Sequence, residues 1–300
     1  MPGIKIDYNR AREVARIAVS MKDSGLFPFG KPNLYPDVTI PTGMKQGDLD
    51  HRLFMYYSSS LDAGRDSYIA YDAMVRFALK VHMTDLPRLE QSELLSLMRE
   101  PFARFGNPEK ALGRPAETLY HNSGKMFREY DNDPNNMLAE TPDKTIHYMM
   151  FGKNKADKFK TVGRGKAALI MKNFVRFKIW PFSEYEIPIK IDRHIISISV
   201  GSGVIKGPEG FEVGRTDKIA RLLEDTYRKI GQENQISAVD MNDAFWIIGR
   251  HLCKINNSVS CMMNCDINCS TRPKLSERAS YYHPQIERRK EIGQLILRFI

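Results

Sequence analysis

Apolar residues recur every three to four positions along most of the chain, which is the period of an amphipathic α-helix. The first such segment starts at Asp7, a residue type that caps helices, carries a stripe with Val14, Ile17 and Met21, and ends at Gly25. Strand signals are weak, so the sequence predicts a mostly α fold. The pattern predicts further helices over 51–60, 67–82, 91–99, 116–129, 142–151, 166–177, 193–200, 216–230, 240–252 and 284–300.

Composition indicates the size class and the compartment. Three hundred residues fit one large domain or two modest ones, and a hydrophobic share of 42% supplies a core. No apolar stretch approaches the roughly 18 residues that span a bilayer, and the N-terminus lacks the apolar segment of a signal peptide. We therefore expect a cytoplasmic protein with no membrane partner.

Positive charge is concentrated in one segment. The net charge is +9, which favours a polyanionic partner, although solubility alone remains an alternative explanation. Between Phe151 and Trp180 the only acidic residue is Asp157, so this tenth of the chain carries a charge of +8. Its nine basic residues are Lys153, Lys155, Lys158, Lys160, Arg164, Lys166, Lys172, Arg176 and Lys178.

All four cysteines also lie in one place, directly after the helix predicted to end near Leu252. They are Cys253, Cys261, Cys265 and Cys269. Zinc sites typically use two CxxC-type knuckles with a longer spacer between them, and this segment has neither. Four thiolates on one compact loop favour a [4Fe–4S] cluster, with zinc as the alternative.

The approach to the first cysteine resembles a known family. The segment FWIIGRHLC, Phe245 to Cys253, resembles the helix that leads into the iron–sulfur loop of the endonuclease III and MutY group of helix-hairpin-helix DNA glycosylases. In that group a Gly-Arg pair stands ahead of the first cysteine, as Gly249 and Arg250 do here. The family loop is Cx6Cx2Cx5C, whereas this one is Cx7Cx3Cx3C over the same 17 residues.

A second resemblance lies in FKTVGRGKAALIMKNF, residues 159–174, which looks like the hairpin of the same family. Its two glycines flank Arg164 in a predicted tight turn, where glycine permits a positive φ. Backbone N–H groups at the start of the next helix bind phosphate without reading sequence. An ordinary turn between two helices is the alternative. The candidate DNA contacts are Lys160, Val162, Gly163, Arg164 and Gly165.

The resemblance implies two catalytic residues. Lys166 opens the second hairpin helix, one position away from the lysine of endonuclease III, and its Gly-Lys pair resembles that of the archaeal 8-oxoguanine glycosylases. Asp192 follows a short hydrophobic stretch and precedes Arg193-His194, which is similar to the setting of the family's essential aspartate. From the residues alone, Asp192 is predicted to be a helix N-cap, and Lys166 could be one more phosphate contact.

The implied function is base-excision repair of double-stranded DNA. The enzyme would flip out and excise 8-oxoguanine or a deaminated base such as uracil or hypoxanthine. Lys166 would attack C1′ and form a Schiff base, which gives AP lyase activity. If Lys166 only contacts phosphate, Asp192 would activate water in a monofunctional glycosylase. A non-catalytic, metal-stabilised nucleic-acid-binding module is the alternative from a different class.

The same resemblance implies the domain organisation. We expect two helical subdomains with the active-site cleft between them. Residues 50–186 would carry the hairpin, and residues 1–49 plus 187–300 would carry the aspartate and the iron–sulfur loop. The protein would act as a monomer, associated with the nucleoid if its host is a prokaryote.

Overall fold

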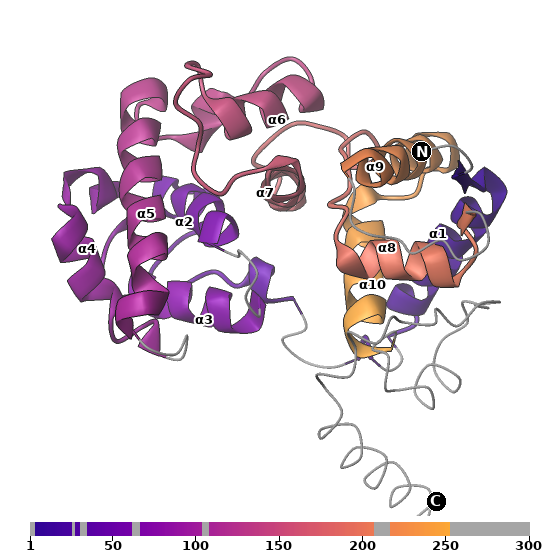
Figure 1. Ribbon diagram of the computed structural model, residues 1–300, viewed down its shortest axis with the longest axis horizontal. Coiled ribbons are helices and arrows are strands. Elements are labelled where there is room, and N and C mark those ends of the chain that lie inside the picture. The colour runs from indigo at the N-terminus through magenta and orange to yellow at the C-terminus, as the bar shows by residue number, and fades with distance from the viewer. Residues whose placement is uncertain are drawn as a thin grey trace, which may run out of the picture. The chain divides into compact units, whose positions relative to one another are not determined.

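The computed structural model describes residues 4–25, 28–30, 35–61, 67–103, 108–206 and 217–252, with side chains except at 108–111 and 217. These residues are mostly helical, which confirms the predicted mostly α fold (Figure 1). Within them, no helix is both long enough and apolar enough to cross a membrane. The helix predicted over 284–300 lies outside the described residues.

The α-helices follow the predicted order closely. They are α1 (Tyr8–Asp23), α2 (Leu49–Leu61), α3 (Ser67–Ala78), α4 (Gln91–Met98), α5 (Pro108–Tyr130), α6 (Pro142–Phe151), α7 (Arg164–Arg176), α8 (Arg193–Gly201), α9 (Asp217–Asn234) and α10 (Ala238–His251). Short 3-10 turns occur at η1 (Pro36–Val38), η2 (Met83–Arg88) and η4 (Pro134–Met137). Two-residue strands β1 (Lys5–Ile6) and β2 (Ile205–Lys206) pair antiparallel.

The chain divides into two compact units. Unit 1 comprises Met1–Pro32, Ile191–Ile236 and Asp240–Ile300, and unit 2 comprises Asn33–Lys190 with Ser237–Val239. Residues 33–49, which the sequence placed with the aspartate, belong to unit 2 because η1 packs against α3 and Asp37 pairs with α7. Lys166 belongs to unit 2 and Asp192 to unit 1.

The core of unit 2 forms around α2 and α7. From Leu53 to Leu61 every residue of α2 is buried, as expected for a central helix that neighbours cover on all sides. Helix α7 packs against both α2 and α6 (Figure 1). The ring of Phe159, which precedes α7, lies edge-on to Tyr56 with centroids 5.5 Å apart. This packing fixes the segment before α7 against α2.

Unit 1 joins the first helix to the last described ones. Helix α1, indigo in Figure 1, packs against α9 although some two hundred residues separate them in sequence. The rings of Tyr227 on α9 and Phe245 on α10 lie 5.0 Å apart between centroids. The hydroxyls of Tyr227 and Ser199 on α8 are hydrogen-bonded at 3.1 Å. A buried aromatic residue thus connects three helices, and this packing sets the position of α8, which begins at Asp192.

Candidate active site

Residues 152–163 connect α6 to α7, and the segment predicted to form the hairpin, residues 159–174, runs from the end of this connection into α7. Within this connection the backbone forms turns and no regular helix. The helix before α7 is therefore α6, and the connection between the two is longer than the tight turn that the sequence predicted. Its first residue, Gly152, ends α6 with φ +69°.

The turn differs from the prediction at its glycines. Gly163 is the N-cap of α7 with an extended backbone, φ −96° and ψ 177°, and Gly165 lies within the helix. The predicted positive φ at these glycines is wrong, because the chain reverses earlier, at Thr161, where φ is +63°. Helix α7 consequently begins at Arg164, two residues before the predicted start.

The start of α7 presents main-chain donors. The first N–H groups of any α-helix have no acceptor within the helix, and Gly163 offers no side chain to cap them. Arg164, the first helical residue, directs its guanidinium to Asp143 on α6 at 2.7 Å. This helix end thus combines uncapped amides with the positive end of the helix dipole, an arrangement suited to an anion.

Side chains of α5 hold the connection in place by binding its main-chain atoms. The Asn122 side chain accepts from the amide of Lys160 at 2.8 Å and donates to the Lys160 carbonyl at 3.0 Å. The Lys160 ammonium pairs with Glu117 at 2.5 Å, and the His121 ring bonds the Lys158 carbonyl at 3.0 Å. Lys160 and Val162, proposed above as DNA contacts, therefore lie in a segment fixed to α5; the Val162 side chain is buried.

A buried ion pair secures the other end of the connection. Lys125 on α5 is fully buried and pairs with Glu129. The second oxygen of Glu129 accepts from the amide of Lys153 at 2.6 Å. A Cβ at Gly152 would lie 2.3 Å from the Glu129 carboxylate and 2.7 Å from the Lys125 ammonium. Glycine is thus favoured at residue 152 by its positive φ, and a side chain there would also displace the ends of the Glu129 and Lys125 side chains.

Lys166 points to the end of α2. Its ammonium donates to the main-chain carbonyl of Ser60 at 2.5 Å, and the hydroxyl of Thr161 donates to the same oxygen at 2.5 Å. Lys166 is half-buried. The carbonyls at a helix C-terminus carry partial negative charge and attract a cation. Sequence reasoning missed Ser60, Thr161 and Asn122, because their roles come from contacts between segments far apart in the chain.

Asp192 caps α8, which confirms the predicted N-cap. Its carboxylate accepts from the amides of His194 at 2.8 Å and Ile195 at 3.2 Å. These bonds fix the side chain at the helix start. Asp192 and Lys166, which the sequence pairs as catalytic residues, are each held by contacts inside their own unit.

The Gly249-Arg250 pair has a local structural explanation. A Cβ at Gly249 would lie 2.4 Å from the Cβ of His194, so only glycine lets α10 approach α8 this closely. Burial lowers the pKa of the His194 imidazole, although the Asp192 carboxylate opposes that effect. The Arg250 guanidinium stacks over Trp246, 5.3 Å from the ring centroid. Both residues belong to α10, so this contact lies within the helix, and it is Gly249 that lets the end of α10 lie next to the start of α8.

The predicted cluster ligands Cys253, Cys261, Cys265 and Cys269 lie outside the described residues. Among the residues that the structure does describe, no group of His, Cys, Asp or Glu side chains is placed to hold a metal ion. The [4Fe–4S] cluster therefore stays a prediction of the cysteine spacing.

Much of the basic segment is neutralised by acids from other parts of unit 2. The Lys172 ammonium lies 2.6 Å from the Asp37 carboxylate, and the Arg176 guanidinium lies 4.0 Å from it. Lys160 and Arg164 also have acidic partners, as described above. On the connection before α7, Lys153, Lys155 and Lys158 are exposed. These lysines therefore contribute more to the positive surface of the protein than the basic residues inside α7 do.

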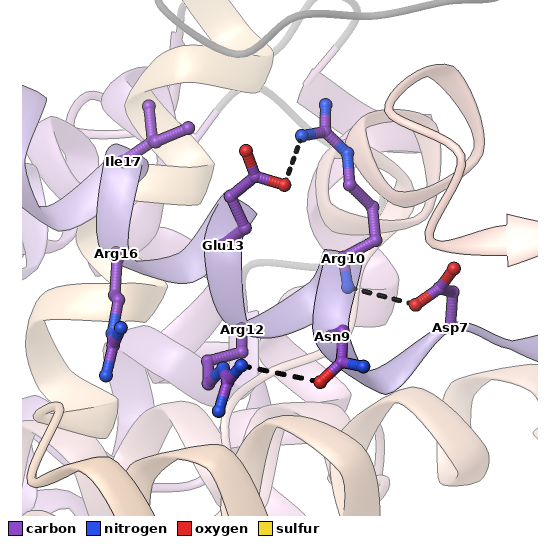
Figure 2. Close-up of a pocket in the computed structure, with 7 residues that line it drawn as sticks. All are labelled: Asp7, Asn9, Arg10, Arg12, Glu13, Arg16 and Ile17. Carbon is purple, nitrogen blue, oxygen red and sulfur yellow. Dashed lines mark hydrogen bonds and ion pairs between the residues drawn. The ribbon is translucent and has the colours of Figure 1, made fainter.

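The surface beside α1 has a shallow pocket, lined by residues between Asp7 and Ile17 (Figure 2). Arg10 pairs with Glu13 at 2.7 Å, and Arg12 contacts the Asn9 amide oxygen at 3.4 Å. Arg10 and Glu13 thus offset each other's charge along the helix. Lys166, Asp192 and the α7 start are not among the residues that line the pocket.

Comparisons of the chain with protein-family models and with curated proteins find no match.

Proposed function

We propose that this protein is a DNA glycosylase of the helix-hairpin-helix type that excises a damaged base and cleaves the resulting abasic site. One observation carries the proposal most directly. Lys166 lies in the first turn of α7, whose N-terminus has no side-chain cap, and its ammonium is held by the Ser60 carbonyl. The first turn of α7 thus places the Lys166 amine in a fixed position beside main-chain N–H groups that are available to bind phosphate.

Lys166 supplies the nucleophile in this proposal. The ammonium first loses a proton, and the free amine then attacks C1′ of the flipped nucleotide while the bond from C1′ to the base breaks. The base leaves with the bonding electron pair and takes up a proton. The sugar ring opens to a Schiff base on Lys166, and loss of a proton from C2′ expels the 3′ phosphate by β-elimination.

Asp192 has the complementary task. In this proposal its carboxylate would stabilise the positive charge that develops on the sugar as the base departs. The N-cap bonds from His194 and Ile195 hold the carboxylate in a single orientation. A fixed negative charge requires little reorganisation during the reaction, which is the basis of its effect on rate.

DNA binding is assigned to the connection and the start of α7. The amides at Gly163, Arg164 and Gly165 would bind a phosphate, and the lysines of the connection would add salt-dependent affinity. Both contact types are independent of base sequence, as a lesion-searching enzyme requires. The substrate bases that we propose are 8-oxoguanine and deaminated bases such as uracil and hypoxanthine.

The four cysteines after α10 would hold a [4Fe–4S] cluster. Four thiolates are the usual donor set of such a cluster, and α10 ends at His251, two residues before the first of them. The cluster would order the loop that follows α10 and supply no redox step to the reaction.

A panel of duplex oligonucleotides, each with one lesion, tests the proposal. We expect release of one class of damaged base, strand cleavage without added base, and four iron atoms in each brown-coloured chain. A colourless, zinc-loaded protein that binds every duplex and releases no base would overturn the proposal. It would favour the non-catalytic binding module instead.

The Ser60 contact also fits a second candidate, a monofunctional glycosylase. In that enzyme Lys166 stays an ammonium and stabilises the α2–α7 junction, while Asp192 activates a water molecule. The Lys166→Gln variant would then still release the base and leave an intact abasic strand.

A further inference from the structure

Thr161 is the most unusual backbone position near Lys166. Its φ of +63° lies in the left-handed region, which β-branched residues rarely adopt because the side chain meets the backbone. Such conformations persist only where surrounding contacts impose them, and they occur preferentially at functional sites. Glycine would adopt this backbone without strain, so the presence of threonine requires an explanation in its side chain.

The hydroxyl of Thr161 supplies that explanation. It donates to the Ser60 carbonyl oxygen at 2.5 Å, the same oxygen that accepts from the Lys166 ammonium. A carbonyl oxygen has two lone pairs, so both donors can bind it together. The two bonds connect the end of α2, the turn before α7 and the first turn of α7 at a single atom.

The backbone on the other side of Thr161 is also fixed. Asn122 binds both the amide and the carbonyl of Lys160, and the buried Val162 side chain follows. The turn therefore has little freedom to relax, and its hydroxyl is directed at the Ser60 carbonyl. These contacts keep that oxygen, and the lysine bound to it, in one place.

We propose that Thr161 is a positioning residue for Lys166, acting through the Ser60 carbonyl that both side chains bind. In the free protein this carbonyl keeps the ammonium in a defined place. Its catalytic consequence rests on the proposed function, because only the glycosylase reaction needs the amine of Lys166 to reach C1′. The arrangement of the three residues is a property of unit 2 and can be tested without DNA.

The first test measures how exposed the Lys166 amine is to chemical labelling. Lysines are labelled in the free, full-length protein by reductive methylation at limiting reagent, and the label is quantified by mass spectrometry relative to exposed Lys155. Thr161→Val removes the hydroxyl and keeps the branched shape, so we expect several-fold more label on Lys166. Thr161→Ser restores the hydroxyl and should restore the wild-type value.

Two further variants separate positioning from folding. Thr161→Gly removes the backbone strain together with the hydroxyl, so it should leave the melting temperature unchanged or raise it, while Lys166 labelling rises. Thr226→Val is the matched control, because Thr226 on α9 also donates its hydroxyl to a main-chain carbonyl, that of Leu222 at 2.7 Å. It should leave Lys166 labelling unchanged. Equal labelling in wild type, Thr161→Val and Thr161→Gly would overturn the proposal.

The second test connects the arrangement to the reaction. Borohydride trapping on abasic DNA should be slowed about tenfold or more in Thr161→Val, because small displacements of a reacting group are costly, and Thr161→Ser should trap like wild type. If wild type traps nothing while labelling changes as expected, the proposed function is wrong and the positioning role stands. If wild type traps and Thr161→Val matches it in both tests, the positioning role is wrong and the proposed function stands.

Discussion

The carboxylate of Asp37 and the ammonium of Lys172 form a buried ion pair 2.6 Å apart, with exposed fractions of 10% and 6% for the two side chains. The pair joins η1, which precedes α2 in the chain, to the middle of α7. It explains why residues 33–49 belong to the same unit as α7. It also removes one lysine of the basic segment from any role at the surface.

Removing one partner of this pair should destabilise the protein strongly. Asp37→Asn leaves the Lys172 ammonium buried without its counter-charge, which typically costs about 3–5 kcal/mol. Urea unfolding followed by circular dichroism measures the change in the free energy of unfolding. The control is Asp23→Asn, which removes an exposed carboxylate 4.0 Å from the Lys22 ammonium. This variant should lower the free energy of unfolding by less than about 1 kcal/mol. Equal effects of the two variants would contradict the importance of the buried pair.

The same pair predicts a dependence of stability on pH. Burial alone would raise the pKa of Asp37, but the nearby charges of Lys172 and Arg176 outweigh it and lower the pKa from 3.8 to about 2. A carboxyl whose pKa is lower in the folded state stabilises the fold above its unfolded pKa. That stabilisation, about 2 kcal/mol, is lost as the pH falls from about 4 to about 2. Urea unfolding across this range should show a loss that is larger in wild type than in Asp37→Asn by about 2 kcal/mol, because the other carboxyl groups with a lowered pKa, such as that of Asp7, are unchanged in the variant.

Gly249 should tolerate no side chain. The Cβ of Gly249→Ala would lie 2.4 Å from the Cβ of His194, so α8 and α10 must separate at a cost of about 1–3 kcal/mol. The amide of His194 donates to the carboxylate of the N-cap Asp192. A displacement of His194 should therefore also slow base release. Gly113→Ala on α5 is the control, since no atom lies within 4 Å of the added Cβ and alanine is the better helix former. Thermal melting distinguishes the two variants, and an unchanged melting temperature for Gly249→Ala would refute the close approach.

Salt dependence of DNA binding should separate surface lysines from paired ones. Lys155→Gln removes an exposed charge on the connection before α7, and loss of one phosphate contact should reduce the slope of log affinity against log salt by about 0.9. Lys172→Gln should leave that slope unchanged, because Asp37 already neutralises Lys172. Fluorescence anisotropy with a lesion-free duplex measures both slopes. Equal slopes for Lys155→Gln and wild type would exclude Lys155 from the DNA interface.

The helices themselves could largely be predicted from sequence, because their apolar periodicity is strong. The N-cap at Asp192 is a local interaction and was identifiable from its residue type. The start of α5 was not, since the apolar period predicted a helix over 116–129, whereas α5 begins at Pro108 and has Pro115 inside it. Proline costs one main-chain hydrogen bond inside a helix, and the packing of α5 against α4 and η2 outweighs this loss.

The candidate site was predicted less completely, because it depends on contacts between distant segments. Two glycines around Arg164 predicted where the chain turns, yet the left-handed residue is Thr161. Nothing in the local sequence of Thr161 indicates that Ser60 lies beside it. The charge of the basic segment was likewise overestimated, because Asp37 is more than a hundred residues away in sequence and adjacent in space. Local patterns predict helices and caps, whereas charge pairing requires the fold.

The most direct test of the central claim is covalent capture of the proposed intermediate. Wild type, Lys166→Gln and the control Lys229→Gln, which changes an exposed lysine of α9, are incubated with duplexes containing 8-oxoguanine, uracil, hypoxanthine or an abasic site in the presence of borohydride, and the cross-linked peptide is identified by mass spectrometry. We expect wild type and Lys229→Gln to form a cross-link on Lys166, and Lys166→Gln to form none. A cross-link of equal yield in Lys166→Gln, or no cross-link by wild type on any duplex, would contradict the assignment of Lys166 as the nucleophile.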